Sequence, residues 1–216
     1  MVKHQQHKNL LRGFFLAVLL GVAGMTELVS QNFVPLIPSH EKLDDQTAKT
    51  FFTRQFVLTQ GNNWFSTNID ITLNDLKAAL EGALPEGNIT IKSQTQNTSY
   101  DPNNHDWSGS LTWDVTKMYE IWVGSACEIM LEGLARNPAE HPVTIGNGSN
   151  WIAYPLNESK SVSTIFTEFA IDGDVVRSQT GNASYRNGRW SGVFNLEPGK
   201  GYIYKSAASS DRSFSF

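Results

Sequence analysis

The chain has 216 residues, of which 40% are apolar and 18% charged, and its formal net charge is −4. This composition can build a hydrophobic core, which excludes disorder and a collagen-like repeat as descriptions of the whole chain. No basic block is present, which argues against nucleic acid as a partner. The single cysteine, Cys127, excludes an intrachain disulfide framework and a cysteine-rich metal site.

Residues 1–30 have the layout of a secretory signal peptide. Three basic residues precede an apolar run at 14–22, and small residues follow it. The run is about half as long as the roughly 20 apolar residues that a transmembrane helix needs. We therefore expect a secreted or cell-surface protein with no transmembrane span in its mature form. Export without disulfides is typical of a bacterial protein.

A polar, proline-containing linker is predicted at 31–52, and the sequence beyond it repeats itself. The offset between the matching motifs falls only from 87 to 83 residues, and each change lies in an expected loop. This order predicts two copies of one unit, at 53–136 and 142–216. The motifs are G-x-N-W at Gly61 and Gly148, K/R-S-Q at Lys92 and Arg177, W-S-G at Trp107 and Trp190, and K-x-Y at Lys117 and Lys200.

Each copy is predicted to consist mostly of strands. Leucines on one face predict a helix at 73–80, capped by Thr72 or Asn74, and a weaker helix is expected at 162–169. The fold class that follows is mainly β, with two tandem homologous units of β-sandwich or barrel-like form, each with one short helix. In the first copy the strands are expected at 54–59, 64–69, 88–94, 98–100, 107–113, 118–123 and 128–131; the second copy repeats the order and ends at 213–216.

Alternation along the strands divides the tryptophans into core and surface candidates. Trp107 and Trp190 share a strand face with apolar residues, so we expect both in the core. Trp122 aligns with Lys205 of the second copy. Because a position that accepts lysine is usually exposed, Trp122 is the clearest candidate for a ring that binds a ligand.

Four further residues are candidate ligand-binding residues. Trp64 and Trp151 follow a Gly/Asn turn, and the sequence leaves open whether they are core or ligand platform. Gln94 and Gln179 stand at the same step of both copies. A glutamine amide suits a sugar hydroxyl or irregular backbone. The structural role is favoured, but a repeated binding site would recur in the same way, so both roles remain open.

Catalytic and metal-binding signals are weak. The three histidines beyond residue 30 lack metal-ligand spacing. The sequence has no nucleophile elbow, phosphate loop or dinucleotide fingerprint. Cys127 aligns with Ser210, and Glu128 aligns with Asp211, so the thiol has no counterpart in the second copy. We therefore expect no enzymatic activity, no cofactor and no metal ligands.

The motifs G-x-N-W, K/R-S-Q, W-S-G and G-K-G-Y-x-Y-K-S, in this order, resemble a repeat module of secreted or surface proteins from Bacteroidetes-type bacteria. The resemblance spans residues 53–216 and departs at 116–119, where Thr-Lys-Met-Tyr replaces the Gly-Lys-Gly-Tyr of 199–202. It implies bacterial export and a non-catalytic, accessory or adhesive role. It carries over no functional residue.

Two functions are consistent with these features. The first is a non-catalytic binding module whose partner is a glycan, held by exposed aromatic and amide side chains, since flat rings stack on the apolar face of a sugar. The second is a structural or adhesive repeat that binds a protein partner or another cell-surface component. Exposed tryptophan beside an amide in a groove favours the first, whereas buried tryptophan without a groove favours the second.

Overall fold

The computed structural model describes residues 51–192 and 194–216, which belong to one compact unit, Thr47–Phe216. The predicted signal peptide at 1–30 and nearly all of the predicted linker lie outside the described residues. Phe51 and Phe52, the last two residues assigned to that linker, already form part of the first strand. As predicted, the described part is mainly β, with antiparallel sheets and two α-helices.

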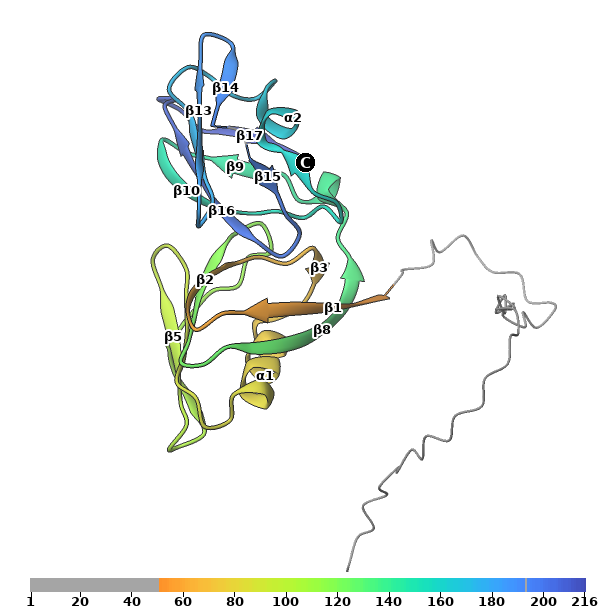
Figure 1. Ribbon diagram of the computed structural model, residues 1–216, viewed down its shortest axis with the longest axis vertical. Helices are drawn as coiled ribbons and strands as arrows, with labels where there is room; N and C mark the ends of the chain where they lie inside the picture. Colours follow the sequence, from red (N-terminus) through yellow and green to blue (C-terminus); the bar gives the residue numbers. More distant parts are fainter. Residues whose placement is uncertain (1–50, 193) are drawn as a thin grey trace, which may run out of the picture. The chain divides into compact units, whose positions relative to one another are not determined.

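The N-terminal half, residues 51–136, contains two antiparallel sheets and one helix (Figure 1). Strands β2-β7-β4-β5-β6 form a five-stranded sheet, and β1-β8-β3 form a three-stranded sheet. The strands are β1 (Phe51–Leu58), β2 (Gly61–Phe65), β3 (Ile69–Asp70), β4 (Ile89–Lys92), β5 (Asn97–Asp101), β6 (Asp106–Ser110), β7 (Tyr119–Val123) and β8 (Cys127–Ala135).

Helix α1 (Leu73–Ala83) extends three residues beyond the predicted end and lies beside β8 (Figure 1). Its N-cap is Thr72, whose hydroxyl accepts from the Asp75 N–H while the Asp75 carboxylate accepts from the Thr72 N–H. These hydrogen bonds lower the pKa of Asp75 and satisfy two backbone donors at the start of the helix. The cap therefore fixes where the helix begins.

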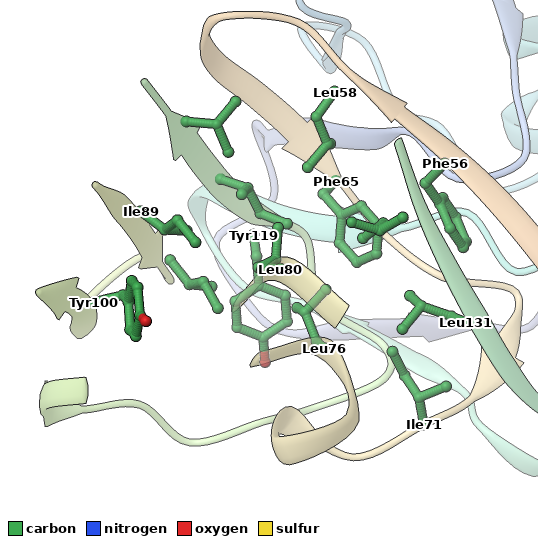
Figure 2. Close-up of a cluster of buried hydrophobic side chains, with 14 of the residues drawn as sticks. Phe56, Leu58, Phe65, Ile71, Leu76, Leu80, Ile89, Tyr100, Tyr119 and Leu131 are labelled. Carbon is green, nitrogen blue, oxygen red and sulfur yellow. The ribbon is translucent and has the colours of Figure 1, made fainter. Parts of the chain in front are cut away.

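The core of this half lies where inward-facing residues of both sheets meet the helix. Leu76 and Leu80 of α1 are fully buried, and Figure 2 shows them beside Tyr119 and Phe65. Each fully buried leucine contributes about 1.5–3 kcal/mol relative to an exposed one. Burial of one helical face therefore holds α1 in place.

The C-terminal half, residues 142–216, follows a short 3-10 turn, Pro138–Glu140, and has its own buried cluster. It contains a five-stranded sheet, β10-β16-β12-β13-β14, and two-stranded sheets β11-β15 and β17-β9 (Figure 1). The elements are β9 (Val143–Ile145), β10 (Gly148–Ala153), β11 (Lys160–Ser161), α2 (Val162–Phe166), β12 (Val175–Arg177), β13 (Asn182–Arg186), β14 (Arg189–Ser191), β15 (Asn195–Leu196), β16 (Gly201–Ser206) and β17 (Arg212–Phe214).

The two five-stranded sheets have the same strand order, because in both the first strand pairs with the last, which pairs with the second. The registers also agree. Trp64 lies opposite Glu120 in the first sheet, and Trp151 lies opposite Ile203 in the second. The two tryptophans are 87 residues apart and their two partners 83 apart, the same offsets as in the sequence motifs. Matching positions of the two sheets are therefore defined residue by residue.

Strand pairing corrects one alignment made from the sequence. Cys127 lies opposite Leu58, and Arg212 lies opposite Ile145, with Leu58 and Ile145 at matching positions of β1 and β9. Cys127 therefore matches Arg212, and its assignment to Ser210 was wrong by two residues. The error arose because the offset changes again in the loop before the last strand.

The backbone conformation explains the glycine of the W-S-G motif in both halves. Gly109 and Gly192 have φ values of 83° and 77°, and a Cβ at either would lie 2.6 Å from a carbonyl oxygen of the neighbouring strand. Only glycine fits this approach. The predicted strand at 107–113 ends at Ser110, one residue after the first of these glycines.

The two tryptophans of that motif differ in burial. Trp190 is 8% exposed and belongs to the core, as predicted. Trp107 is only half-buried: its indole N–H donates to Glu81, and the Lys77 ammonium lies 4.8 Å from its ring centroid. The core assignment of Trp107 therefore holds only for the ring face that packs against the cluster.

Candidate functional site

Two grooves of similar construction are the main candidates for a binding site. Each is lined by a tryptophan from one half and by a glutamine, an acidic residue, a lysine and a tyrosine from the other half. Their volumes, about 390 and about 450 Å³, are in the range of small-molecule sites. The Trp64 groove is formed by Trp64, Gln179, Glu197, Lys200 and Tyr202, and the Trp151 groove by Trp151, Gln94, Asp114, Lys117 and Tyr119.

The glutamines hold the two halves together at these grooves. The Gln94 Nε2 donates to the Ser149 carbonyl at 2.8 Å, and its Oε1 accepts from the Trp151 N–H at 3.3 Å. Each glutamine amide thus takes the place that a peptide group of a neighbouring strand would occupy. The amide therefore caps the free edge of β10.

The reciprocal contact is present on the other side. The Gln179 Nε2 donates to the Asn62 carbonyl at 2.7 Å, and its Oε1 accepts from the Trp64 N–H at 3.1 Å. Both glutamines therefore make structural contacts, and each retains one N–H and one lone pair for a ligand.

The serine of each Ser-Gln pair shapes the turn that presents the glutamine. The Ser93 hydroxyl accepts from the backbone N–H of Thr95 at 3.3 Å and of Gln96 at 3.0 Å. The Ser178 hydroxyl accepts from the two matching N–H groups at 3.3 and 2.9 Å. The Ser-Gln pair therefore recurs because its serine stabilises a turn and its glutamine, which follows, bonds to the other half.

The G-x-N-W motif positions the tryptophans. Gly61 and Gly148 have φ values of 92° and 82°, which glycine adopts without strain. The Asn63 amide donates to three carbonyls, including that of Ile121 in the adjacent strand at 3.2 Å, and Asn150 makes the matching bonds. A rigid turn therefore fixes the strand from which each tryptophan extends.

A second pair of backbone contacts closes the same edges. The Ser66 N–H donates to the Gly199 carbonyl at 3.1 Å, and the Ala153 N–H donates to the Thr116 carbonyl at 2.9 Å. These four residues also occupy matching positions. Strands β2 and β10, the edge strands of their sheets, are thus each covered by the other half.

The groove tyrosines are uncharged hydrogen-bonding groups. Burial raises the pKa of Tyr119 to about 12, and its hydroxyl accepts from the Asp114 N–H at 2.6 Å. Burial likewise raises the pKa of Tyr202, whose hydroxyl accepts from the Glu197 N–H at 2.6 Å. Each hydroxyl therefore fixes the turn that carries the acidic residue of its groove.

Trp122 lies outside both grooves, on the outward face of the first five-stranded sheet. It is 39% exposed, lies opposite Asn62 and Thr90, and is a diagonal neighbour of Trp64 across Glu120. Diagonal neighbours on a sheet are close enough for large side chains to bind one ligand together. Trp122 therefore extends the surface of the Trp64 groove.

The structure brings together four of the five candidate residues in two pairs, Trp64 with Gln179 and Trp151 with Gln94. Sequence reasoning missed the lysines Lys117 and Lys200. The signal was present, because both lysines recur at matching positions before a tyrosine. It was not used, since only the structure shows that they face a tryptophan of the other half.

The other chemistry-bearing groups are dispersed. Cys127 is a free thiol that is partly buried, and burial raises its pKa. Within the described ranges, no three His, Cys, Asp or Glu side chains come close enough to hold a metal ion. No helix found between residues 51 and 216, Val193 aside, has the length and apolar character required to cross a bilayer.

Because comparisons with known proteins find nothing similar, a function must be assigned from the fold and the grooves. A scan against protein-family models, a search of curated proteins and a search of solved structures all find no match.

Proposed function

We propose that the protein is an exported, non-catalytic module that binds a glycan at the Trp64 groove and the adjoining Trp122. The observation that carries this proposal is a half-buried tryptophan beside an amide, a lysine and a carboxylate in a groove of about 390 Å³. An indole ring stacks on the apolar face of a sugar while neighbouring polar groups bind its hydroxyls.

We further propose that the two halves are copies of one unit. The common strand order, the common register and the reciprocal glutamine contacts support this reading. The recurrence gives each groove a counterpart, so a repeated ligand along a polymer would meet two similar sites. Two sites on one chain raise the apparent affinity for a polymer without a new contact.

The test is binding to a panel of neutral polysaccharides, measured by affinity electrophoresis and calorimetry. We expect Trp64→Ala and Trp122→Ala each to weaken binding about tenfold or more, the equivalent of about 1.4 kcal/mol. Met130→Ala is the matched control, since Met130 is an exposed apolar residue on strand β8, 56% accessible, and does not line the groove.

Stability measurements separate a binding role from a packing role. Trp122→Ala is expected to leave the melting temperature nearly unchanged because the ring is exposed. Binding that survives both tryptophan substitutions would remove the groove from consideration. If no polysaccharide binds the wild-type protein, the glycan proposal fails.

A protein-binding, adhesive role is the second candidate, and one surface favours it. Val57 and Met130 are 58% and 56% exposed and are diagonal neighbours on the outward face of β1 and β8. Exposed apolar residues on neighbouring strands are typical of contact surfaces between proteins. Met130→Lys, at the residue of this pair that does not line the Trp64 groove, would abolish binding to a protein partner and leave glycan binding intact.

A further inference from the structure

The outward face of the C-terminal five-stranded sheet carries four cations and no acidic residue. Arg177, Arg186, Arg189 and Lys205 are all exposed and share this face in the strand register. Strands β10, β12, β13, β14 and β16 contain no Asp or Glu. We call these four residues the basic face.

The cations are spread along the sheet. Lys205 lies opposite Val175 of β12, and Arg177 is two residues further along that strand. Arg177 lies opposite Asn182, the first residue of β13, whereas Arg186 is the last residue of β13. From the row of Arg177 to the row of Arg186, the face extends about 13 Å along the strands, four residues at about 3.3 Å each. An elongated polyanion matches this shape better than a single small ion.

The arrangement is also costly for the protein alone. Arg186 and Arg189 lie directly opposite each other across β13 and β14. Like charges in this position are destabilising. Among the described residues, the ion pairs of the protein involve other cations, so an anionic ligand is the group that would relieve the repulsion.

The matching face of the N-terminal sheet shows that the basic face is not a requirement of the fold. Asp101 and Asp106 occupy the positions of Arg186 and Arg189, and Trp122 occupies the position of Lys205. Lys92, at the position of Arg177, is paired with Glu120 at 3.8 Å. The charge of the two faces is therefore inverted on the same strand framework.

We propose that the basic face binds an acidic polysaccharide that carries carboxylate groups. Three of the four cations are arginines, whose planar guanidinium binds a carboxylate with two parallel hydrogen bonds. Ser149, Ser184 and Ser191 lie in one row on this face and offer hydroxyls to sugar hydroxyls. This second site differs from the Trp64 groove in place and ligand charge, so it stands independently of that proposal.

The experiment compares Arg177→Gln/Lys205→Gln with the control Lys92→Gln/Lys160→Gln, which removes the same charge from two surface ion pairs. The probes are polygalacturonate, neutral galactan, an oligonucleotide duplex and phosphatidylglycerol vesicles. We expect the wild type and the control to bind polygalacturonate, with affinity that falls as salt is raised. The basic-face variant should bind at least tenfold more weakly, with a log–log salt slope smaller by about two.

Several outcomes would overturn the proposal. They are equal affinity of the two double variants for polygalacturonate, a loss of galactan binding in the basic-face variant as large as its loss of polygalacturonate binding, and equal or tighter binding of the duplex or the vesicles by the wild type. Trp64→Ala distinguishes the two sites, because it should weaken neutral glycan binding only. Unchanged or raised melting temperature in Arg189→Gln would show that the face is not needed for folding.

Discussion

Three matching positions show how the two halves build the same part of the fold with opposite chemistry. The N-terminal half places Ile89, Ile121 and Cys127 there, and both isoleucines are fully buried. The C-terminal half places Asp174, Tyr204 and Arg212 at the same three positions. One backbone framework therefore accepts either an apolar contact or a buried ion pair.

In the polar version, Asp174 is 0% exposed and stands at the centre of a hydrogen-bond network. The carboxylate accepts from Tyr204 at 2.5 Å and from Arg212 at 2.8 Å, and from the backbone N–H of Ile171 and Ala207. Burial raises the pKa of Asp174, but these hydrogen bonds outweigh it and lower the pKa overall. Burial also raises the pKa of Tyr204, which stays protonated as a donor.

The largest expected effect is loss of this network. Asp174→Ala should lower the free energy of unfolding by about 3–5 kcal/mol, because it leaves the Tyr204 hydroxyl, two backbone donors and the charge of Arg212 without the carboxylate that they bind. Ile89→Ala, at the matching position, should cost about 2–5 kcal/mol through a cavity. Urea unfolding of both variants measures the difference.

The polar and apolar versions of this region should differ in how their contribution to stability depends on pH. Since the folded pKa of Asp174 lies below its unfolded value of 3.8, its stabilisation is present above that value and is lost as pH falls through the folded pKa. The effect of Asp174→Ala should therefore shrink as pH falls below 3.8, whereas that of Ile89→Ala should stay constant. A constant effect for both would contradict the assigned role of Asp174.

The next effect concerns a position where the halves must differ. Met118 and Gly201 match each other, and a Cβ at Gly201 would overlap the buried Met118 side chain. Gly201→Ala should cost about 1–3 kcal/mol by overpacking, and part of that loss should disappear in a Met118→Ala background. Gly82→Ala is the control, since a Cβ there meets open space in α1 and should stabilise the helix.

The smallest expected effect tests the equivalence of the interhalf contacts. Gln94→Ala and Gln179→Ala should each lower the free energy of unfolding by about 1 kcal/mol, because each removes two hydrogen bonds at an exposed edge. The exposed Gln60, substituted in the same way, gives the baseline. Unequal losses from the two glutamines would show that the halves are less alike than their hydrogen bonds indicate.

Local features were predictable from the sequence. Alternation and turn residues predicted most strands, and the leucine spacing predicted α1, because these signals depend on neighbours in the chain. Strand ends were less accurate: β2 stops at Phe65 because Ser66 bonds to Gly199 of the other half. Ser66 also bonds to Lys200, and partners more than 130 residues away cannot be recognised from the sequence around the end of β2.

The candidate site shows the same division. The recurring residues Trp64 and Gln179 were identified, yet their contact joins positions 115 residues apart and required the structure. The four cations of the basic face are scattered between Arg177 and Lys205 in the sequence, and strand pairing was needed to place them on one surface. The recurring motifs therefore identified residues that line the grooves, but they did not show which of these residues contact one another.

The coverage of β2 and β10 has a consequence for longer assemblies. Each half provides one glutamine and offers one edge of this kind, β2 or β10, so the two halves satisfy each other at these two edges. An odd number of such halves in a chain would leave one edge exposed to unwanted strand pairing. Adding such halves two at a time would keep every edge of the β2 and β10 kind covered.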